Sequence, residues 1–167
     1  MKVFDSTYFE NLTKQAKGGL RRRQHGNIHE SYRDPCQRLF NAIEPGSYIR
    51  PHKHAADPRD ELLIAIRGAM ALVTFDDAGA VQGVLRLAAD GYGGDAVVGT
   101  EVPANVWHTV VALESGSVLL EVKAGPFDPS QPKDLAAWAP EEGAQEASIY
   151  LRELEVEVAK GTNSPGS

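Results

Sequence analysis

Cysteine is almost absent from this sequence: Cys36 is the only one in 167 residues, so no disulfide can form within the chain. A small secreted domain held by disulfides is therefore excluded, and a reducing cytoplasm is the expected location. Long apolar runs are missing as well. Residues 1–15 carry charges where a secretory signal needs an apolar segment, and no uncharged apolar stretch approaches the roughly 18 residues of a membrane span. We expect a cytoplasmic protein with no membrane partner.

Positive charge is also scarce, because 17 lysines and arginines face 23 aspartates and glutamates and leave a formal net charge of −6. A protein that binds nucleic acid needs a basic surface, so we expect no nucleic-acid partner. The run Arg21-Arg22-Arg23 is a local exception. It predicts either a solvated turn or an anion-binding site.

Length and composition fit one globular domain, since 42% of the residues are hydrophobic and 24% are charged. Four zones follow one another along the chain. We predict an N-terminal helix and arm over residues 1–34 and a β-barrel over 35–125. A C-terminal extension with a helix is predicted over 126–160, and a flexible tail over 161–167.

Helical spacing of apolar residues predicts one helix near each end of the chain. The first covers residues 6–17, with Ser6 as its N-cap and the Gly18-Gly19 pair after its end. Its apolar face is Tyr8, Phe9, Leu12 and Ala16. The second covers residues 144–160, and its apolar face is Ala147, Leu151, Leu154 and Val158.

Between the helices, short segments rich in Val, Ile, Leu and Phe alternate with turn residues. Strands are predicted over residues 39–43, 47–50, 61–66, 69–75, 81–87, 101–102, 109–113 and 118–123. Strong turn signals lie at 44–47, 76–79 and 114–117. Many short strands without intervening helices indicate an all-β sandwich or barrel.

Four side chains are candidates for one metal site. His52 and His54 are two residues apart in an extended segment, so their imidazoles point to the same side and can bind one ion. Glu61 opens the next strand across a loop at 55–60 and can reach the same interior point. His108 enters a later strand, where it can complete a set of four ligands. It follows Pro103 and Asn105, which suit a tight turn, and asparagine tolerates the left-handed conformation there.

Both segments resemble the two motifs of the cupin superfamily. The first motif is Gly, five residues, His-x-His, a short gap, Glu, six residues and Gly, and it corresponds to residues 46–68. The second is Pro-x-Gly, two residues and His, and it corresponds to residues 103–108 with Asn105 in place of the Gly. The gap before Glu61 is longer than usual, which leaves Asp60 as an alternative carboxylate ligand. The six-residue spacing from Glu61 to Gly68 favours Glu61.

The resemblance extends to the WbuC family of cupin-fold metalloproteins over roughly residues 20–155. The stretches that carry it are Arg22-Arg23 with Asn27 and His29, and residues 37–39, 50–54, 103–111, 121–126 and 133–143. It implies a single cupin (jelly-roll) β-barrel with a metal held by His52, His54, Glu61 and His108. It also implies a role near polysaccharide and O-antigen biosynthesis and, by analogy with other cupin barrels, a homodimer.

Three imidazoles and one carboxylate suit one divalent ion, which can be Fe, Zn, Mn, Ni or Co. With neutral histidines and one Glu, the centre carries a charge of roughly +1, which favours a small anionic or sugar-like substrate. Further polar residues are candidates for the same pocket. For substrate binding they are Arg38, which can grip an anion if it faces inward, with Asn41, Asn27 and Arg50. For proton transfer they are His29 and Tyr48.

Three functions are consistent with such a site. The first is a metal-dependent isomerase or epimerase of a small sugar-derived substrate, favoured over hydride transfer because the chain has no glycine-rich nucleotide-binding motif. The second is an Fe(II)-dependent dioxygenase. The third is a non-enzymatic cupin that binds a metabolite, since one fold supports many functions.

Overall fold

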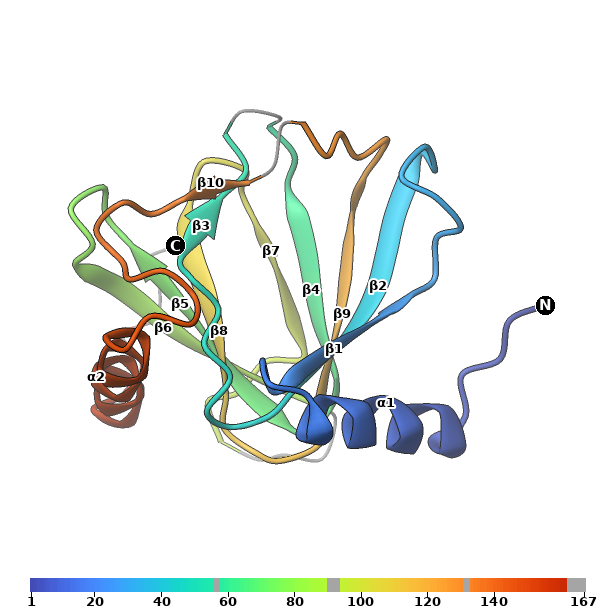
Figure 1. Cartoon of the computed structure of the whole chain (residues 1–167), viewed down its shortest axis with the longest axis horizontal. Coiled ribbons are helices and arrows are strands. Elements are labelled where there is room, and N and C mark those ends of the chain that lie inside the picture. The colour runs from blue at the N-terminus through green and yellow to red at the C-terminus, as the bar shows by residue number, and fades with distance from the viewer. Residues whose placement is uncertain (56–57, 90–93, 131–132, 162–167) are drawn as a thin grey trace.

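Two antiparallel sheets face each other in the computed structural model, which describes residues 1–55, 58–89, 94–130 and 133–161 (Figure 1). The first sheet runs, from edge to edge, β1 (Arg23–Asn27), β2 (Cys36–Ile43), β9 (Ser117–Ala124), β4 (Glu61–Arg67) and β7 (Gly99–Val102). The second runs β10 (Asp134–Leu135), β3 (His52–Lys53), β8 (Trp107–Ala112), β5 (Ala69–Phe75) and β6 (Val81–Ala88). The chain crosses repeatedly from one sheet to the other, as a jelly roll does. This confirms the predicted all-β cupin barrel.

Alternating burial along the strands builds the core between the sheets. In β4, Glu61, Leu63 and Ala65 are buried, while Leu62 between them is exposed. The inward residues join a hydrophobic cluster that includes Ile43, Met70, Leu72, Leu87 and Leu119. Strand β5 is buried along almost its whole length because its outer face is covered as well.

Helix α1 (Ser6–Gly18) packs on the outside of the first sheet (Figure 1). Leu12 and Ala16 are buried against Phe40 of β2, with Tyr8 and Phe9 beside them. The predicted N-cap at Ser6 is wrong, because Ser6 is already helical. The carboxylate of Asp5 accepts a hydrogen bond from the backbone N–H of Tyr8 at 2.9 Å instead.

Helix α2 (Ala147–Ala159) covers the outside of the second sheet. Leu151, Leu154 and Val158 pack there against Val73 and Val111, as their helical spacing predicts. The helix begins three residues later than predicted, because residues 142–146 form turns, and Ala144 N–H donates there to the carbonyl of Glu141.

The segment predicted as a strand over residues 47–50 has no strand pairing in the structure. Its polar groups bond elsewhere: Ser47 N–H donates to Glu44 in a turn, and the carbonyl of Ile49 accepts from the Thr109 hydroxyl at 2.6 Å. Conversely, the predicted irregular arm contains β1, which pairs with β2 and aligns Asn27 with Leu39. Residues 162–167 of the predicted tail lie outside the described residues. Neither helix of the described chain is long and apolar enough to cross a membrane.

The packing of α2 predicts a sharp difference between two of its aliphatic residues. Leu151→Ala should lower the free energy of unfolding by about 2–5 kcal/mol, because it leaves a cavity against the second sheet. Ile149→Ala should change it by less than about 0.5 kcal/mol, because Ile149 is 51% exposed. Urea unfolding of both variants measures the difference, and equal losses would contradict the placement of α2.

Candidate metal centre

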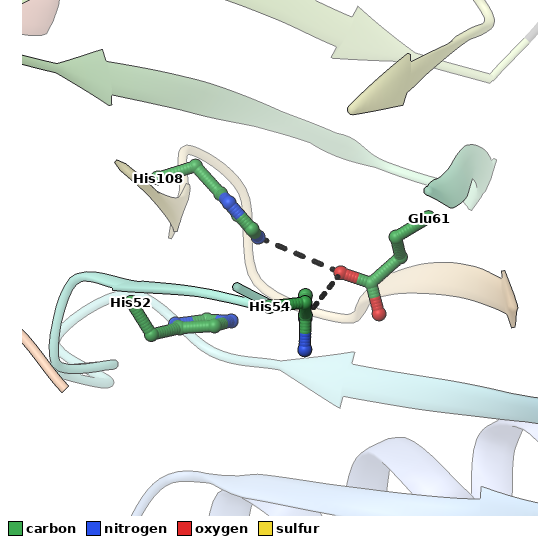
Figure 2. Close-up of side chains that lie close together, drawn as sticks. All are labelled: His52, His54, Glu61 and His108. Carbon is green, nitrogen blue, oxygen red and sulfur yellow. Dashed lines mark ion pairs between the residues drawn. The ribbon is translucent and has the colours of Figure 1, made fainter. Parts of the chain in front are cut away.

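His52, His54, Glu61 and His108 meet inside the barrel, and each offers one ligand atom within 4.8 Å of those of the others (Figure 2). The histidines come from the β3 and β8 side of the barrel, and Glu61 comes from β4 in the opposite sheet. The cluster therefore exists only when the two sheets face each other. Its members are buried apart from His54, which is half-buried.

Strand pairing brings the three histidines together. His52 lies directly opposite His108 in the antiparallel pair of β3 and β8. His52 and His54 point inward, whereas Lys53 between them points outward, with its ammonium 4.4 Å from the Trp107 ring centre. The backbone N–H of His54 donates to the carbonyl of Ala104 at 2.8 Å, which ties β3 to the loop before β8.

Backbone carbonyls orient two of the imidazoles. Nδ1 of His52 lies 3.1 Å from the carbonyl oxygen of Arg50, and Nδ1 of His108 lies 2.9 Å from that of Val106. Because a carbonyl oxygen only accepts, Nδ1 carries the proton in both rings and Nε2 keeps its lone pair for a metal. Burial, followed by the positive charge of Lys133, lowers the pKa of His52 well below its ordinary value, so this ring is neutral.

Glu61 faces two of these imidazoles. Its Oε2 lies 3.5 Å from Nε2 of His54 and 3.5 Å from Nε2 of His108, and its Oε1 accepts from the Lys123 ammonium at 3.0 Å. Burial alone raises the pKa of Glu61, but contact with His108 and His54 and the charge of Lys123 outweigh burial. They hold the pKa well below its ordinary value, so Glu61 is ionised.

The donor set fits a divalent metal ion. The carboxylate of Glu61 and imidazole nitrogens of three histidines converge here, and lone pairs that face one another repel unless a cation lies between them. Buried Nε2 of His54 has no hydrogen-bond partner among the described residues, as expected for an atom whose partner is a metal. The mixed N/O set suits a first-row divalent ion.

The choice between the two neighbouring carboxylates is clear in the structure. Glu61 belongs to the cluster, whereas the Asp60 carboxylate accepts from the backbone N–H of Ala104 at 3.0 Å. The predicted tight turn before His108 is present, since Val106 N–H donates to Pro103 at 3.0 Å. The expected left-handed conformation of Asn105 is wrong, because Asn105 does not have a positive φ.

A cavity of about 340 Å³ opens from the cluster. Leu63, Val110 and Leu119 line its apolar part and also belong to the core between the sheets. Its remaining walls are largely polar. Tyr32 and Phe127 also line it, and their rings meet edge to face with centres 5.2 Å apart. The cavity is large enough for a small polar molecule next to the metal site.

Three of the residues predicted for the pocket line this cavity. Asn41 lies on β2 and donates through Nδ2 to the Glu121 carboxylate at 2.7 Å. Asn27 lies at the end of β1, and His29 follows it, buried, with Nδ1 held by the backbone of Arg38. The N-terminal arm therefore contributes to the cavity wall.

Three other predicted pocket residues do not line the cavity. The expected inward orientation of Arg38 is wrong: it alternates with Gln37 and Leu39, and its side chain, 42% exposed, lies 3.6 Å from Asp34. Arg50 donates to the carbonyl of Ala136 at 2.8 Å and so anchors the C-terminal extension. Tyr48 donates to the carbonyl of Pro140 at 2.8 Å within the core beneath α2, so it is not in position for proton transfer.

Six further ionisable side chains of the cavity, among the described residues, were not predicted. They are Arg21, Arg23, His25, Glu121, Lys123 and Lys133. One signal was available: Leu119, Glu121 and Lys123 alternate on a predicted strand, and an inward apolar residue implies inward charged ones. Arg21 and Arg23 both bind Glu142 of the C-terminal extension, at 2.9 and 2.6 Å. This closes the barrel on that side.

Burial shifts the protonation of several cavity groups. Burial and then the charge of Glu61 raise the pKa of Glu121. Burial lowers the pKa of Lys133 to about 8, against the opposing effect of Glu121 and Glu61. For Lys123 burial acts in the same direction, but the charges of Glu61 and Glu121 outweigh it and raise the pKa. Lys123 is therefore positively charged at neutral pH.

The fold and site together define a cupin barrel with a candidate metal centre. A family model described as a domain of unknown function (DUF6016) matches residues 4–87, and the chain belongs to this family. No curated protein matches the chain.

Solved structures share the fold at low sequence identity. Protein SO0799 from Shewanella oneidensis has 11% identity and a TM-score of 0.54, over 86% of this chain and 87% of that one. KdgF from Halomonas sp. has 18% identity and a TM-score of 0.46, over 66% and 84%. A mutant of Bacillus subtilis oxalate decarboxylase OxdC has 14% identity and a TM-score of 0.47, over 68% and 27%. OxdC is described as having Mn(II) centres. Similarity at these identities shows the fold alone.

The carboxylate assignment predicts opposite results for two adjacent residues. Glu61→Gln should weaken binding of Mn(II) or Zn(II) by more than the roughly 10- to 100-fold typical of an outer-shell change, because it removes a ligand charge. Asp60→Asn should weaken metal binding by no more than this roughly 10- to 100-fold, because Asp60 bonds to the loop at Ala104 and is not a ligand. Competition with a chromophoric chelator measures both affinities. Loss in Asp60→Asn alone would reverse the assignment.

Metal binding should also stabilise the fold. An ion at about 100 times its Kd contributes about 2.7 kcal/mol, which for a chain of this size raises Tm by about 5–10 °C. EDTA should reverse the shift, and His108→Ala should abolish it. Differential scanning calorimetry measures the change, and an unchanged Tm in the wild-type protein would argue against a site in the folded barrel.

Proposed function

We propose that this protein is a metal-dependent enzyme that isomerises or epimerises a small polar or anionic substrate, such as a sugar-derived acid. The supporting observation is the convergence of His52, His54, Glu61 and His108 at one end of a cavity of about 340 Å³ that also contains lysines and carboxylates. When bound there, a divalent ion supplies a Lewis acid that polarises a carbonyl or hydroxyl oxygen.

The cavity walls hold the substrate next to the ligand cluster. Lys123 is already hydrogen-bonded to Glu61, so it fixes the orientation of that ligand and offsets its charge. Apolar Leu63 and Val110 limit the water around the reacting atoms. The walls therefore favour a compact polar molecule over an extended one.

Isomerisation requires a group that takes a proton from one carbon and returns it to a neighbouring atom. Of the two candidates from the sequence, His29 lines the cavity and Tyr48 does not. His29 is anchored through Nδ1, which leaves Nε2 as the atom for proton transfer. Glu121 is a second candidate, because it lines the cavity and burial raises its pKa above the ordinary value of a carboxyl group.

We also propose the finer assignment to the WbuC family, a role in polysaccharide biosynthesis and a cytoplasmic location. The matching stretches at residues 103–111 and 133–143, and the single cysteine, support these assignments. A homodimer is proposed by analogy with other cupin barrels. Light scattering after size-exclusion chromatography tests it.

Metal analysis and a proton-exchange assay test the enzymatic proposal together. The purified protein should contain one first-row divalent ion per chain and should incorporate deuterium from D₂O next to the carbonyl of a keto- or aldo-sugar acid. His52→Ala should lose both properties. Lys53→Ala should keep both, because Lys53 points away from the cavity over Trp107.

Two other outcomes correspond to other functions. Oxygen consumption by the Fe(II)-loaded protein with such substrates would identify a dioxygenase instead. A metal-loaded protein that binds sugar acids without exchange or turnover would identify a non-enzymatic metabolite-binding cupin. A protein that holds no divalent metal would contradict the proposal.

A further inference from the structure

Lys133 enters the cavity from the C-terminal extension. It immediately precedes β10, which pairs with β3 so that Asp134 aligns with Lys53 and Leu135 with His52. One step further in this register, Lys133 lies across from His54, and both side chains line the cavity. The extension thus places a cation on the wall next to a metal ligand.

This ammonium group has no ion-pair or hydrogen-bond partner within the described ranges of the chain. The other cavity lysine, Lys123, is bonded to Glu61, and Arg21 and Arg23 are both bonded to Glu142. The carboxylate that acts most strongly on Lys133 is Glu121, which accepts its hydrogen bond from Asn41. Lys133 is therefore the cavity cation that is available to a ligand.

Asn41 leaves a matching acceptor unused. Its Nδ2 donates to Glu121, but its Oδ1 is buried without a hydrogen-bond partner in the described structure, and the residue is only 4% exposed. A buried acceptor without a partner costs about 1–3 kcal/mol. A hydroxyl group of a bound ligand would remove this cost. Asn41 is bonded to Glu121, Lys133 is within the influence of the Glu121 charge, and all three line one cavity of about 340 Å³, so one small molecule can reach both Asn41 and Lys133.

Charge in the cavity favours an anion. Lys123 and Lys133 balance Glu61 and Glu121, while Arg21 and Arg23 share the single carboxylate of Glu142. A divalent ion on the four ligands adds positive charge that no further cavity carboxylate compensates in the described part of the chain. Buried uncompensated charge is unfavourable, so an anionic ligand should bind with the metal.

We infer that Lys133 and Asn41 form a subsite for a hydroxycarboxylate, in which Lys133 binds the carboxylate and Asn41 Oδ1 accepts a hydrogen bond from a hydroxyl of the same molecule. The inference rests on the proposed function, because the subsite orients the substrate against the metal centre. It also defines the substrate class as an acid that carries hydroxyl groups. The cavity corresponds to about ten water molecules, enough for a six-carbon chain.

Three probes separate the two contacts. Gluconate carries both a carboxylate and hydroxyls, sorbitol carries these hydroxyls with one more hydroxyl in place of the carboxylate, and hexanoate carries the carboxylate without hydroxyls. Calorimetry on the full chain loaded with Co(II) should show tighter binding of gluconate than of either other probe. The expected advantage over sorbitol is about 10- to 100-fold, as for a hydrogen bond to a charged group.

Two variants should then lose different contacts. Lys133→Met should weaken gluconate by about 10- to 100-fold and leave sorbitol unchanged. Asn41→Ala should weaken gluconate by roughly 2- to 10-fold and leave hexanoate unchanged. Lys160→Met is the matched control, because Lys160 is on the surface at the end of α2 and bonds to Glu157. All variants should bind one Co(II) per chain.

Two results would overturn the inference. In the first, the wild-type protein does not bind gluconate, or binds it no more tightly than sorbitol. In the second, Lys133→Met binds gluconate as tightly as the wild-type protein does. In both cases the Co(II) content of the protein shows whether the proposed function is contradicted together with the subsite. A protein that binds Co(II) but does not prefer gluconate contradicts the subsite alone, whereas a protein that binds no Co(II) contradicts the proposed function.

Discussion

Electron-pair donors that face one another inside a barrel need a positive charge between them, and this constraint organises the molecule. Glu61 lies 3.5 Å from Nε2 of His54 and from Nε2 of His108, and the carbonyl of Val106 orients the other nitrogen of His108. One sheet supplies the carboxylate and the other supplies the histidines. Lys123 partly offsets the charge of Glu61, but it lies on one side only. The convergence of the four donors is therefore unfavourable without a cation and suited to a divalent ion.

The barrel separates an apolar half from a polar half. Leu63, Val110 and Leu119 belong to the core and also line one part of the cavity. The polar half is closed by segments from both ends of the chain. Arg23 of β1 reaches Glu142 of the extension at 2.6 Å, and β10 pairs with β3. The central strands bring the four candidate ligands together. The terminal segments that cover the barrel determine which other side chains lie near this candidate metal centre.

Local sequence patterns predicted the central strands well because each pattern records burial on one face. Strand β5 has the bounds predicted from its apolar run, and β4 differs by one residue. Strand β1 was missed because Arg23–Asn27 contains no apolar alternation and forms only by pairing with β2. The strand predicted over residues 47–50 is absent for the opposite reason. Its apolar residues are buried, but its backbone bonds to turns and side chains rather than to a neighbouring strand.

The sequence by itself determined the three histidine ligands and favoured Glu61 over Asp60 as the fourth, since His-x-His alternation, a following carboxylate and a turn before His108 are local features. Only the tertiary structure decided between Asp60 and Glu61, because that choice depends on the hydrogen bond from Ala104 N–H to Asp60. It also turned Arg38 outward and brought in Lys133, 25 residues beyond His108. Lys133 reaches the cavity through the pairing of β10 with β3, a long-range contact that leaves no periodic signal in either segment.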